Sequence, residues 1–312
     1  MATEAATQLP QSGPDASIAN GTGMDALMDD AKKRGLHEEI SRLTDNHLVY
    51  TDAAGGKLSF APVDWQKPGL RILDSATADG IWLQDLRKRA GSVAEKQTYI
   101  GTDLVTDLFP DPRPEGIEFI KQSITEPWPT EWHESFDLVH QRQVLGFCGD
   151  FSLEQAVANL CGLAKPGGWV ELVELDCDQS TLGEGTAARE FFQLLEQIWK
   201  IKKMGGNFGP NLKEWMENAG LEDVQVDILE CKVGARAKPE LKEASINGAA
   251  GAGPMIVAMA RTKALPELEG FTSEQLDTLD TRVRKELSEK GAEFQSFAVR
   301  GRVPAGGLKP KK

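Results

Sequence analysis

Residues 72–82, ILDSATADGIW, decide how this chain folds. A short apolar run ends in an acid at Asp74, and small residues then lead into an amphipathic segment. This order predicts a buried strand over 70–76, a tight turn, and a helix over 80–90. In a parallel sheet such a turn lies at the carboxyl ends of the strands, where the helix N-terminus offers unpaired N–H groups to an anionic ligand. The same turn also occurs as ordinary packing, so on its own it leaves ligand binding open.

Short apolar runs alternate with amphipathic segments along the rest of the chain. Six further strands are predicted, at 98–103, 117–124, 136–142, 167–175, 224–233 and 294–303. Helices are predicted at 152–164, 186–203, 211–219, 249–263 and 272–289. Alternating strands and helices are typical of βαβ units and a parallel sheet. The sequence therefore predicts an α/β domain with a doubly wound, mostly parallel, seven-stranded sheet.

The N-terminal region divides into two parts ahead of a main domain at 66–312. Residues 1–23 have too little apolar surface to offset the entropy of ordering, which predicts a disordered leader. Residues 24–65 carry apolar side chains at helical spacing and predict a helical cap segment. Because the leader lacks Lys and Arg, it is unlike a signal or transit peptide, and we expect a cytoplasmic protein.

Charge and composition restrict the class of partner. The formal net charge is −13, from 48 acidic and 35 basic residues. Such a surface repels phosphate backbones and anionic lipids, which argues against nucleic acid or a membrane as the main partner. The four cysteines form no C-x-x-C pair and no metal-type spacing, so no metal site is expected. A small-molecule partner fits best, and no pattern specifies an oligomeric state.

A second acid follows the second predicted strand. The segment TYIGTD (98–103) ends at Asp103, 29 residues after Asp74. A carboxylate at this place in α/β folds accepts hydrogen bonds from ribose hydroxyls. A turn or helix-capping role is an equally good interpretation of Asp103 in isolation. Together with the turn, Asp103 favours an adenosine-type ligand, and the absence of G-x-G-x-x-G argues against a nicotinamide dinucleotide.

Six segments, taken in order, resemble those of class I S-adenosylmethionine (SAM)-dependent methyltransferases. They are ILDSATADGIW (72–82), YIGTDL (99–104), FIKQSITEPWP (119–129), FDLVHQR (136–142), LAKPGGWVELVE (163–174) and LKEWMENAGLEDV (212–224). Over about residues 36–304 the chain is most similar to the fungal secondary-metabolism branch of LaeA-like and UMTA-like proteins. The resemblance implies a Rossmann-like fold, SAM as cofactor and S-adenosylhomocysteine (SAH) as product. It also implies methyl transfer to an N, O or S atom of a small natural product.

The resemblance also implies where the two ligands bind. The residues expected to contact the cofactor are Asp74, Ser75, Ala76, Ala78, Gly80, Trp82, Asp103, Leu104, Ser123, Ile124, His140, Gln141 and Arg142. Within this set, Asp103 would hold the ribose, and the last three residues would flank the sulfonium end. Met204, Asn207 and Phe208 are candidate contacts of the acceptor, because the Gly-rich loop at 204–210 should lie over the strand ends; a place in the core is the alternative for Phe208. Helical insertions at about 178–219 and 234–292 would roof that pocket.

Two histidines are candidate general bases by their position, His140 and His47. Methyl transfer is an in-line displacement, so alignment and proximity supply most of the acceleration. A base is needed only where the acceptor carries a proton. A structural hydrogen-bonding role is the alternative for each histidine.

The sequence departs from the family at the turn. The family usually has glycine where Ala76 and Ala78 stand, and often an acid where Ser123 stands. Because alanine resists positive φ, we predict negative φ at both alanines in a working enzyme. Two alternatives stay open. One is a methyltransferase-like regulator that acts through protein partners and lacks a deep acceptor pocket. The other is a SAM-binding enzyme that catalyses a non-methylating reaction such as a cyclisation.

Overall fold

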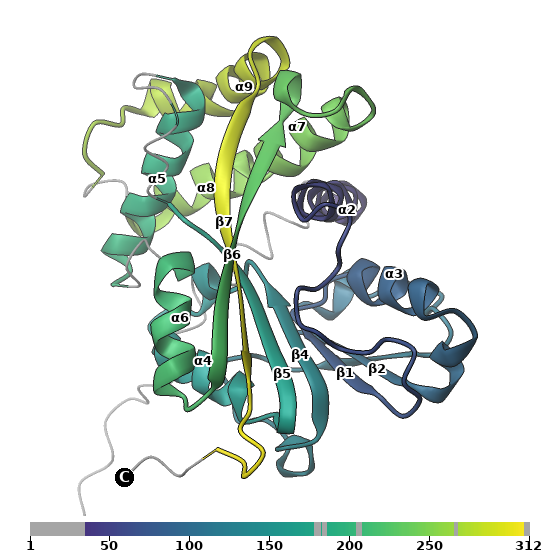
Figure 1. Ribbon diagram of the computed structural model, residues 1–312. Helices are drawn as coiled ribbons and strands as arrows, with labels where there is room; N and C mark the ends of the chain where they lie inside the picture. Colours follow the sequence, from purple (N-terminus) through teal and green to yellow (C-terminus); the bar gives the residue numbers. More distant parts are fainter. Residues whose placement is uncertain (1–34, 178–181, 183–185, 204–207, 265–267, 309–312) are drawn as a thin grey trace, which may run out of the picture.

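A computed structural model describes residues 35–177, 182, 186–203, 208–264 and 268–308 (Figure 1). The predicted leader at 1–23, the start of the predicted cap segment at 24–34, and the predicted acceptor residues Met204 and Asn207 lie outside these ranges. Within the described ranges, no helix is long and apolar enough to cross a membrane.

The centre of the fold is a seven-stranded sheet. Its strands are β1 (Arg71–Ser75), β2 (Thr98–Asp103), β3 (Ile117–Lys121), β4 (Phe136–Arg142), β5 (Ala164–Leu175), β6 (Glu222–Val233) and β7 (Ala292–Arg302). Their spatial order is β3-β2-β1-β4-β5-β7-β6, with β7 antiparallel to both neighbours and the first five strands parallel. The order reverses between β1 and β4, which is where doubly wound sheets bind ligands. The predicted doubly wound, mostly parallel fold is confirmed.

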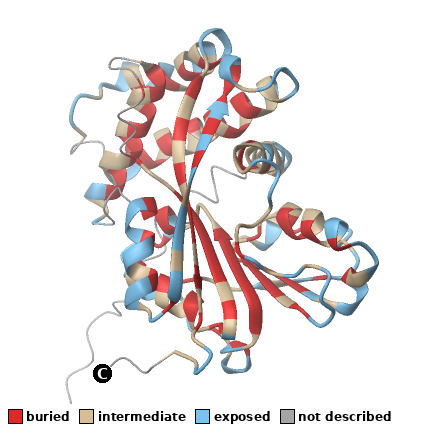
Figure 2. Cartoon of the chain, in the orientation of Figure 1, coloured by how far each residue is buried: buried red, intermediate tan, exposed pale blue. Residues whose placement is uncertain are grey.

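Helices cover both faces of the sheet. They are α2 (Leu36–Ala53), α3 (Ile81–Ala90), α4 (Leu153–Cys161), α5 (Ala187–Ile201), α6 (Phe208–Asn218), α7 (Lys242–Ala250), α8 (Gly253–Met259) and α9 (Ser273–Glu289). Figure 1 shows α3 on one side of the sheet, and α4 with α6 on the other. Neighbouring residues of β1 point to opposite sides of the sheet. Ile72 belongs to a group of buried apolar side chains that includes those of α3, and Leu73 belongs to a larger group that includes those of α4. Burial on both faces explains why neighbouring residues of an inner strand, such as Ile72 and Leu73, are both apolar and do not alternate with polar ones (Figure 2).

The helices α5, α7, α8 and α9 form a separate group beyond the carboxyl ends of the inner strands (Figure 1). The start of α9 is fixed by a capping box, in which Thr272 and Gln275 each bond the other's backbone N–H. Near its other end, Glu286 accepts hydrogen bonds from Ala187 N at 2.9 Å and Ala188 N at 3.2 Å. The carboxylate therefore caps α5 and ties α5 to α9.

The prediction of one continuous helix over 249–263 is wrong. The structure has two helices there, because α7 ends at Ala250 and α8 begins at Gly253. Pro254 stands in the first turn of α8, where its missing N–H is tolerated, whereas it would break a continuous helix. The apolar residues after Pro254 keep helical spacing, which is why the pattern alone joined the two segments.

Candidate active site

A cavity of about 1160 Å³ lies at the carboxyl ends of the inner strands. Side chains that follow β1, β2 and β4 line one part of it. The other part, which we call the apolar chamber, is lined by Phe191, Phe192, Leu195, Trp199, Met255, Ile256, Met259, Val283, Leu287 and Phe294. Pockets for single small molecules measure about 300–1,000 Å³, so this cavity has room for a nucleoside and a second small molecule.

Asp103 lines the cavity at the end of β2 and is 8% exposed. Its Oδ2 accepts a hydrogen bond from Ala78 N at 2.9 Å, and its Oδ1 accepts one from Val105 N at 2.9 Å. Burial raises the pKa of Asp103 above its ordinary value, and these backbone bonds oppose the shift. An ionised carboxyl offers about four lone-pair sites. Acceptor capacity therefore remains for the hydroxyl groups of a ligand.

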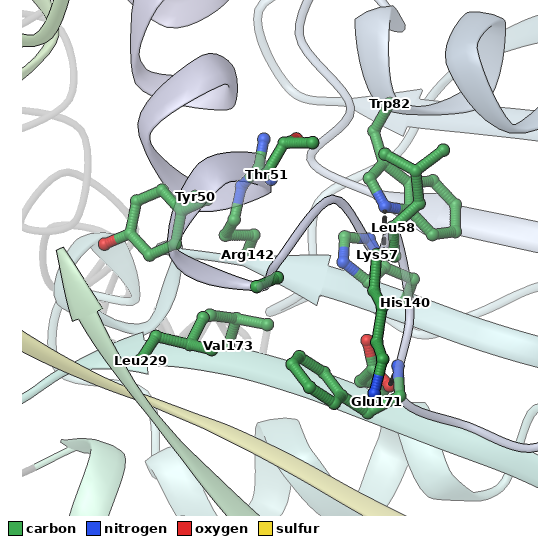
Figure 3. A pocket seen from close by; sticks show the side chains of 12 residues that line it. Tyr50, Thr51, Lys57, Leu58, Trp82, His140, Arg142, Glu171, Val173 and Leu229 are labelled. Atoms are coloured by element: carbon green, nitrogen blue, oxygen red, sulfur yellow. Dashed lines mark hydrogen bonds between the residues drawn. The ribbon is translucent and has the colours of Figure 1, made fainter. Parts of the chain in front are cut away.

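Asp74, His140 and Trp82 form a fixed group beside the turn. His140 Nδ1 lies 2.7 Å from Asp74 Oδ1, and its ring stacks on Trp82 with centroids 3.9 Å apart and planes 2° from parallel. Trp82 Nε1 in turn donates to Leu58 O at 2.8 Å (Figure 3). Since the carboxylate can only accept, Nδ1 carries the proton and Nε2 of a neutral ring is left as an acceptor. The ring of His140 is thus held in one orientation and one tautomer.

A strap, residues 58–61, crosses the sheet beside this group. It is anchored on Glu171, whose Oε2 accepts hydrogen bonds from Phe60 N at 2.7 Å and Ala61 N at 2.9 Å. Under the strap lies a second cavity of only about 20 Å³, enough for about one water molecule. Figure 3 shows His140 at this cavity between Trp82 and Glu171. The strap therefore covers His140 at the smaller cavity, while His140 also lines the larger one.

The turn between β1 and α3 has a backbone that we predicted wrongly. Ala76 and Ala78 have φ of 55° and 51°, not negative values. Hydrogen bonds explain the conformation, because Ala78 N–H donates to Asp103 and the Thr77 hydroxyl donates to Asp74 Oδ2 at 2.6 Å. These bonds hold the turn in the left-handed region, which costs an L-residue other than glycine about 1–2 kcal/mol. The two alanines thus adopt the backbone that glycine adopts without strain.

Replacing Ala76 and Ala78 together with glycine should therefore stabilise the protein. Relief of left-handed strain exceeds the added entropy of the unfolded chain, and we expect a net gain of about 1 kcal/mol and a melting temperature about 2 °C higher. Thermal unfolding followed by calorimetry measures the change. The matched control is Ala158→Gly within α4, which should lose about 1 kcal/mol because glycine weakens a helix interior. A double variant that loses as much as the control would contradict the account of the turn.

Gly80 is required for a different reason. It ends the turn with φ of 73°, and a Cβ added there would lie 2.6 Å from the Phe119 ring. Gly80 therefore lets α3 begin close to the sheet, although it does not itself line the cavity.

Ser75 and Gln141 were also predicted at the cofactor but lie outside the lining of the cavity. They are on the other face of the sheet from Asp74 and His140, where the Ser75 hydroxyl donates a hydrogen bond to Gln141 Oε1 at 3.0 Å.

His47 is not brought to either cavity. Its Nε2 lies 3.2 Å from Asp85 Oδ2, and its Nδ1 accepts from the Arg142 guanidinium at 3.2 Å. Burial, and then the charge of Arg142, lower the pKa of His47 to about 4. A base with so low a pKa is weak at neutral pH. His47 is therefore placed to position Arg142, which does line the cavity.

The remaining predicted residues divide between the cavity and the core. Leu104, Ser123, Ile124 and Arg142 line the cavity together with Ala76 and Ala78. Phe208 does not, because it begins α6 at 1% exposure and packs behind Trp199, with ring centroids 4.5 Å apart. Trp199 thus occupies the place at the cavity that we predicted for Phe208.

Sequence reasoning missed Glu174. This residue is 2% exposed and lines the cavity at the end of β5. The available signal was an acid inside the otherwise apolar run that forms a central strand, since acids are almost never buried unless they are partnered. Glu171 gives the same signal, and its partners are the backbone N–H groups of the strap.

Comparison with known proteins places the chain in a family. A methyltransferase domain model matches residues 46–226. The chain is 37% identical to methyltransferase psoC of Aspergillus fumigatus, over 89% of this chain and 99% of that protein. It is 36% identical to N-methyltransferase sirN of Leptosphaeria maculans, over 89% and 93%, and 34% identical to N-methyltransferase tcpN of Claviceps purpurea, over 89% and 99%. With the sheet order and the cavity already described, these matches show that the chain belongs to the methyltransferase family and is a class I methyltransferase.

Proposed function

We propose that this enzyme transfers the methyl group of SAM to a nitrogen atom of a small, largely apolar natural product. The observation that carries the proposal is one cavity in which Asp103, at a strand end, and the apolar chamber lie together. Two of the relatives are named N-methyltransferases, which favours nitrogen over oxygen or sulfur. A cavity of this size argues against a regulator without an acceptor pocket. A cytoplasmic location stays part of the proposal.

The residues around the cavity fit SAM. Asp103 has lone pairs left for the two ribose hydroxyls. Arg142 lines the same cavity, and among the described residues it forms no ion pair with a carboxylate, so its guanidinium is available for the carboxylate of the methionine part. Asp79 also lines the cavity and bears a charge that suits the ammonium group.

When bound, SAM supplies a methyl group on a positively charged sulfur. The contribution of the chain is to align this group with the acceptor and to exclude water, because both raise the rate of a displacement. His140 is held by Asp74 and Trp82 with Nε2 as its free acceptor, which suits it to receive the proton that the acceptor nitrogen loses. This is the role that we propose for His140.

The proposal is tested with SAM that carries a deuterated methyl group and a panel of small secondary amines. We expect SAH to accumulate and one product to gain the labelled methyl group in place of a hydrogen, with neither signal from boiled protein. SAM binding with a product that carries no label would instead indicate a non-methylating reaction. Absence of SAM binding would favour the regulator.

A further inference from the structure

Glu174 is a buried carboxylate with one oxygen free. Its Oε1 accepts hydrogen bonds from Val144 N at 2.8 Å and Leu145 N at 3.0 Å, which fix the side chain. No described donor bonds Oε2. The side chain nevertheless lines the cavity. One oxygen is therefore anchored to the protein and the other is open to a ligand.

No cation of the described residues neutralises this carboxylate. The titratable side chains that interact with it are Tyr50, Cys148 and Cys177, and burial raises the pKa of each, so all three are neutral near pH 7. Desolvation raises the pKa of Glu174 to about 7, and only the two backbone bonds oppose the shift. A buried charge without a partner is unfavourable unless a ligand supplies one.

The surrounding wall restricts that ligand. The apolar chamber belongs to the same cavity, and its aromatic and aliphatic side chains suit a molecule with an apolar body. An anionic group would be repelled by Glu174. A hydroxyl could donate one hydrogen bond but leave the charge in place. A protonated amine donates a hydrogen bond and also brings a positive charge that offsets the negative charge of the carboxylate.

We propose that Glu174 binds the methyl acceptor through an amine nitrogen that donates a hydrogen bond to Oε2, so that the acceptor is an apolar molecule bearing an amine. This inference rests on the proposed function and adds the chemical class of the acceptor. Glu174 then determines specificity, because it admits amines and excludes carboxylic acids of the same shape.

The test uses three probes of matching shape on the SAH-loaded protein: phenethylamine, phenethyl alcohol and hydrocinnamate. Binding is measured by ligand-observed NMR at pH 8. The amine should bind the native protein about tenfold or more tightly than the other two, as a charged hydrogen bond predicts. Glu174→Gln should lose this preference, since glutamine keeps an oxygen for Val144 and Leu145 but has no charge. Glu126→Gln, at an exposed carboxylate on the same cavity, should keep the preference.

A pH series separates binding from a merely structural role. Between pH 8 and pH 6 Glu174 takes up a proton, so amine binding to the native protein should weaken, and the weak binding to Glu174→Gln should not change. Equal binding of the three probes, or an unchanged amine preference in Glu174→Gln, overturns the assignment. SAH titration distinguishes the two proposals. If SAH binds and the amine preference is absent, only this inference fails; if SAH does not bind, the proposed function fails.

Discussion

Replacing Asp103 with alanine is expected to weaken SAM binding by about a hundredfold or more. Each hydrogen bond from a ribose hydroxyl to a charged carboxylate contributes about 1.5–3 kcal/mol, and alanine removes both. The substitution also removes the partner of Ala78 N–H, and this bond helps to hold the turn beneath the ligand. Isothermal titration of the purified variant with SAM measures the loss, and circular dichroism reports whether the fold is retained.

The matched control is Asp107→Ala. Asp107 follows four residues later, is exposed, and does not line the cavity, so its removal should leave the dissociation constant unchanged. An Asp103→Ala variant that is folded and binds SAM as tightly as the native protein would remove the basis for placing the cofactor at the carboxyl end of β2.

The sequence was enough to predict the fold because its inner strands are buried on both faces. Segments such as 136–142 and 167–175 carry adjacent apolar residues, as at Leu138-Val139 and Trp169-Val170, and each is followed or preceded by a segment of helical spacing. Asp74 and Asp103 were predictable for the same reason, since an acid at the end of a buried parallel strand must lie at the carboxyl end of the sheet, where ligands bind. The structure places Asp74 beside His140 and Asp103 beside the turn.

Tertiary contacts decided what the sequence left uncertain. The positive φ of Ala78 depends on a hydrogen bond to Asp103, 25 residues away, which no local preference could reveal. Phe208 stands in a Gly-rich segment that was predicted as a loop, but α6 begins at Phe208 and packs it against Trp199. His47 has the residue type of a base, but burial beside Arg142 makes it a poor one.

Glu174→Gln is expected to make the protein more stable at pH 8. Burial raises the pKa of Glu174 from 4.5 to about 7, so the folded state prefers the protonated carboxyl. Below pH 4.5 the carboxyl is protonated in both the folded and the unfolded protein, and the protein has its full stability. As the pH rises through 7 the folded protein must also ionise the buried carboxyl, and this part of its stability is lost. A neutral glutamine avoids the loss. The pKa difference corresponds to about 3 kcal/mol at pH 8, and to much less at pH 5.

Urea unfolding at pH 5 and pH 8 measures this difference directly. Glu217→Gln, on the exposed side of α6, is the matched control and should show no comparable dependence on pH. A gain confined to high pH would mean that the fold bears a cost for keeping a charge in the cavity. Such a cost is expected where a residue is retained for binding, because function and stability then make opposite demands on it. If Glu174→Gln instead destabilises the protein at both pH values, the carboxylate serves the fold through Val144 and Leu145, and its unpaired oxygen loses its significance for the acceptor.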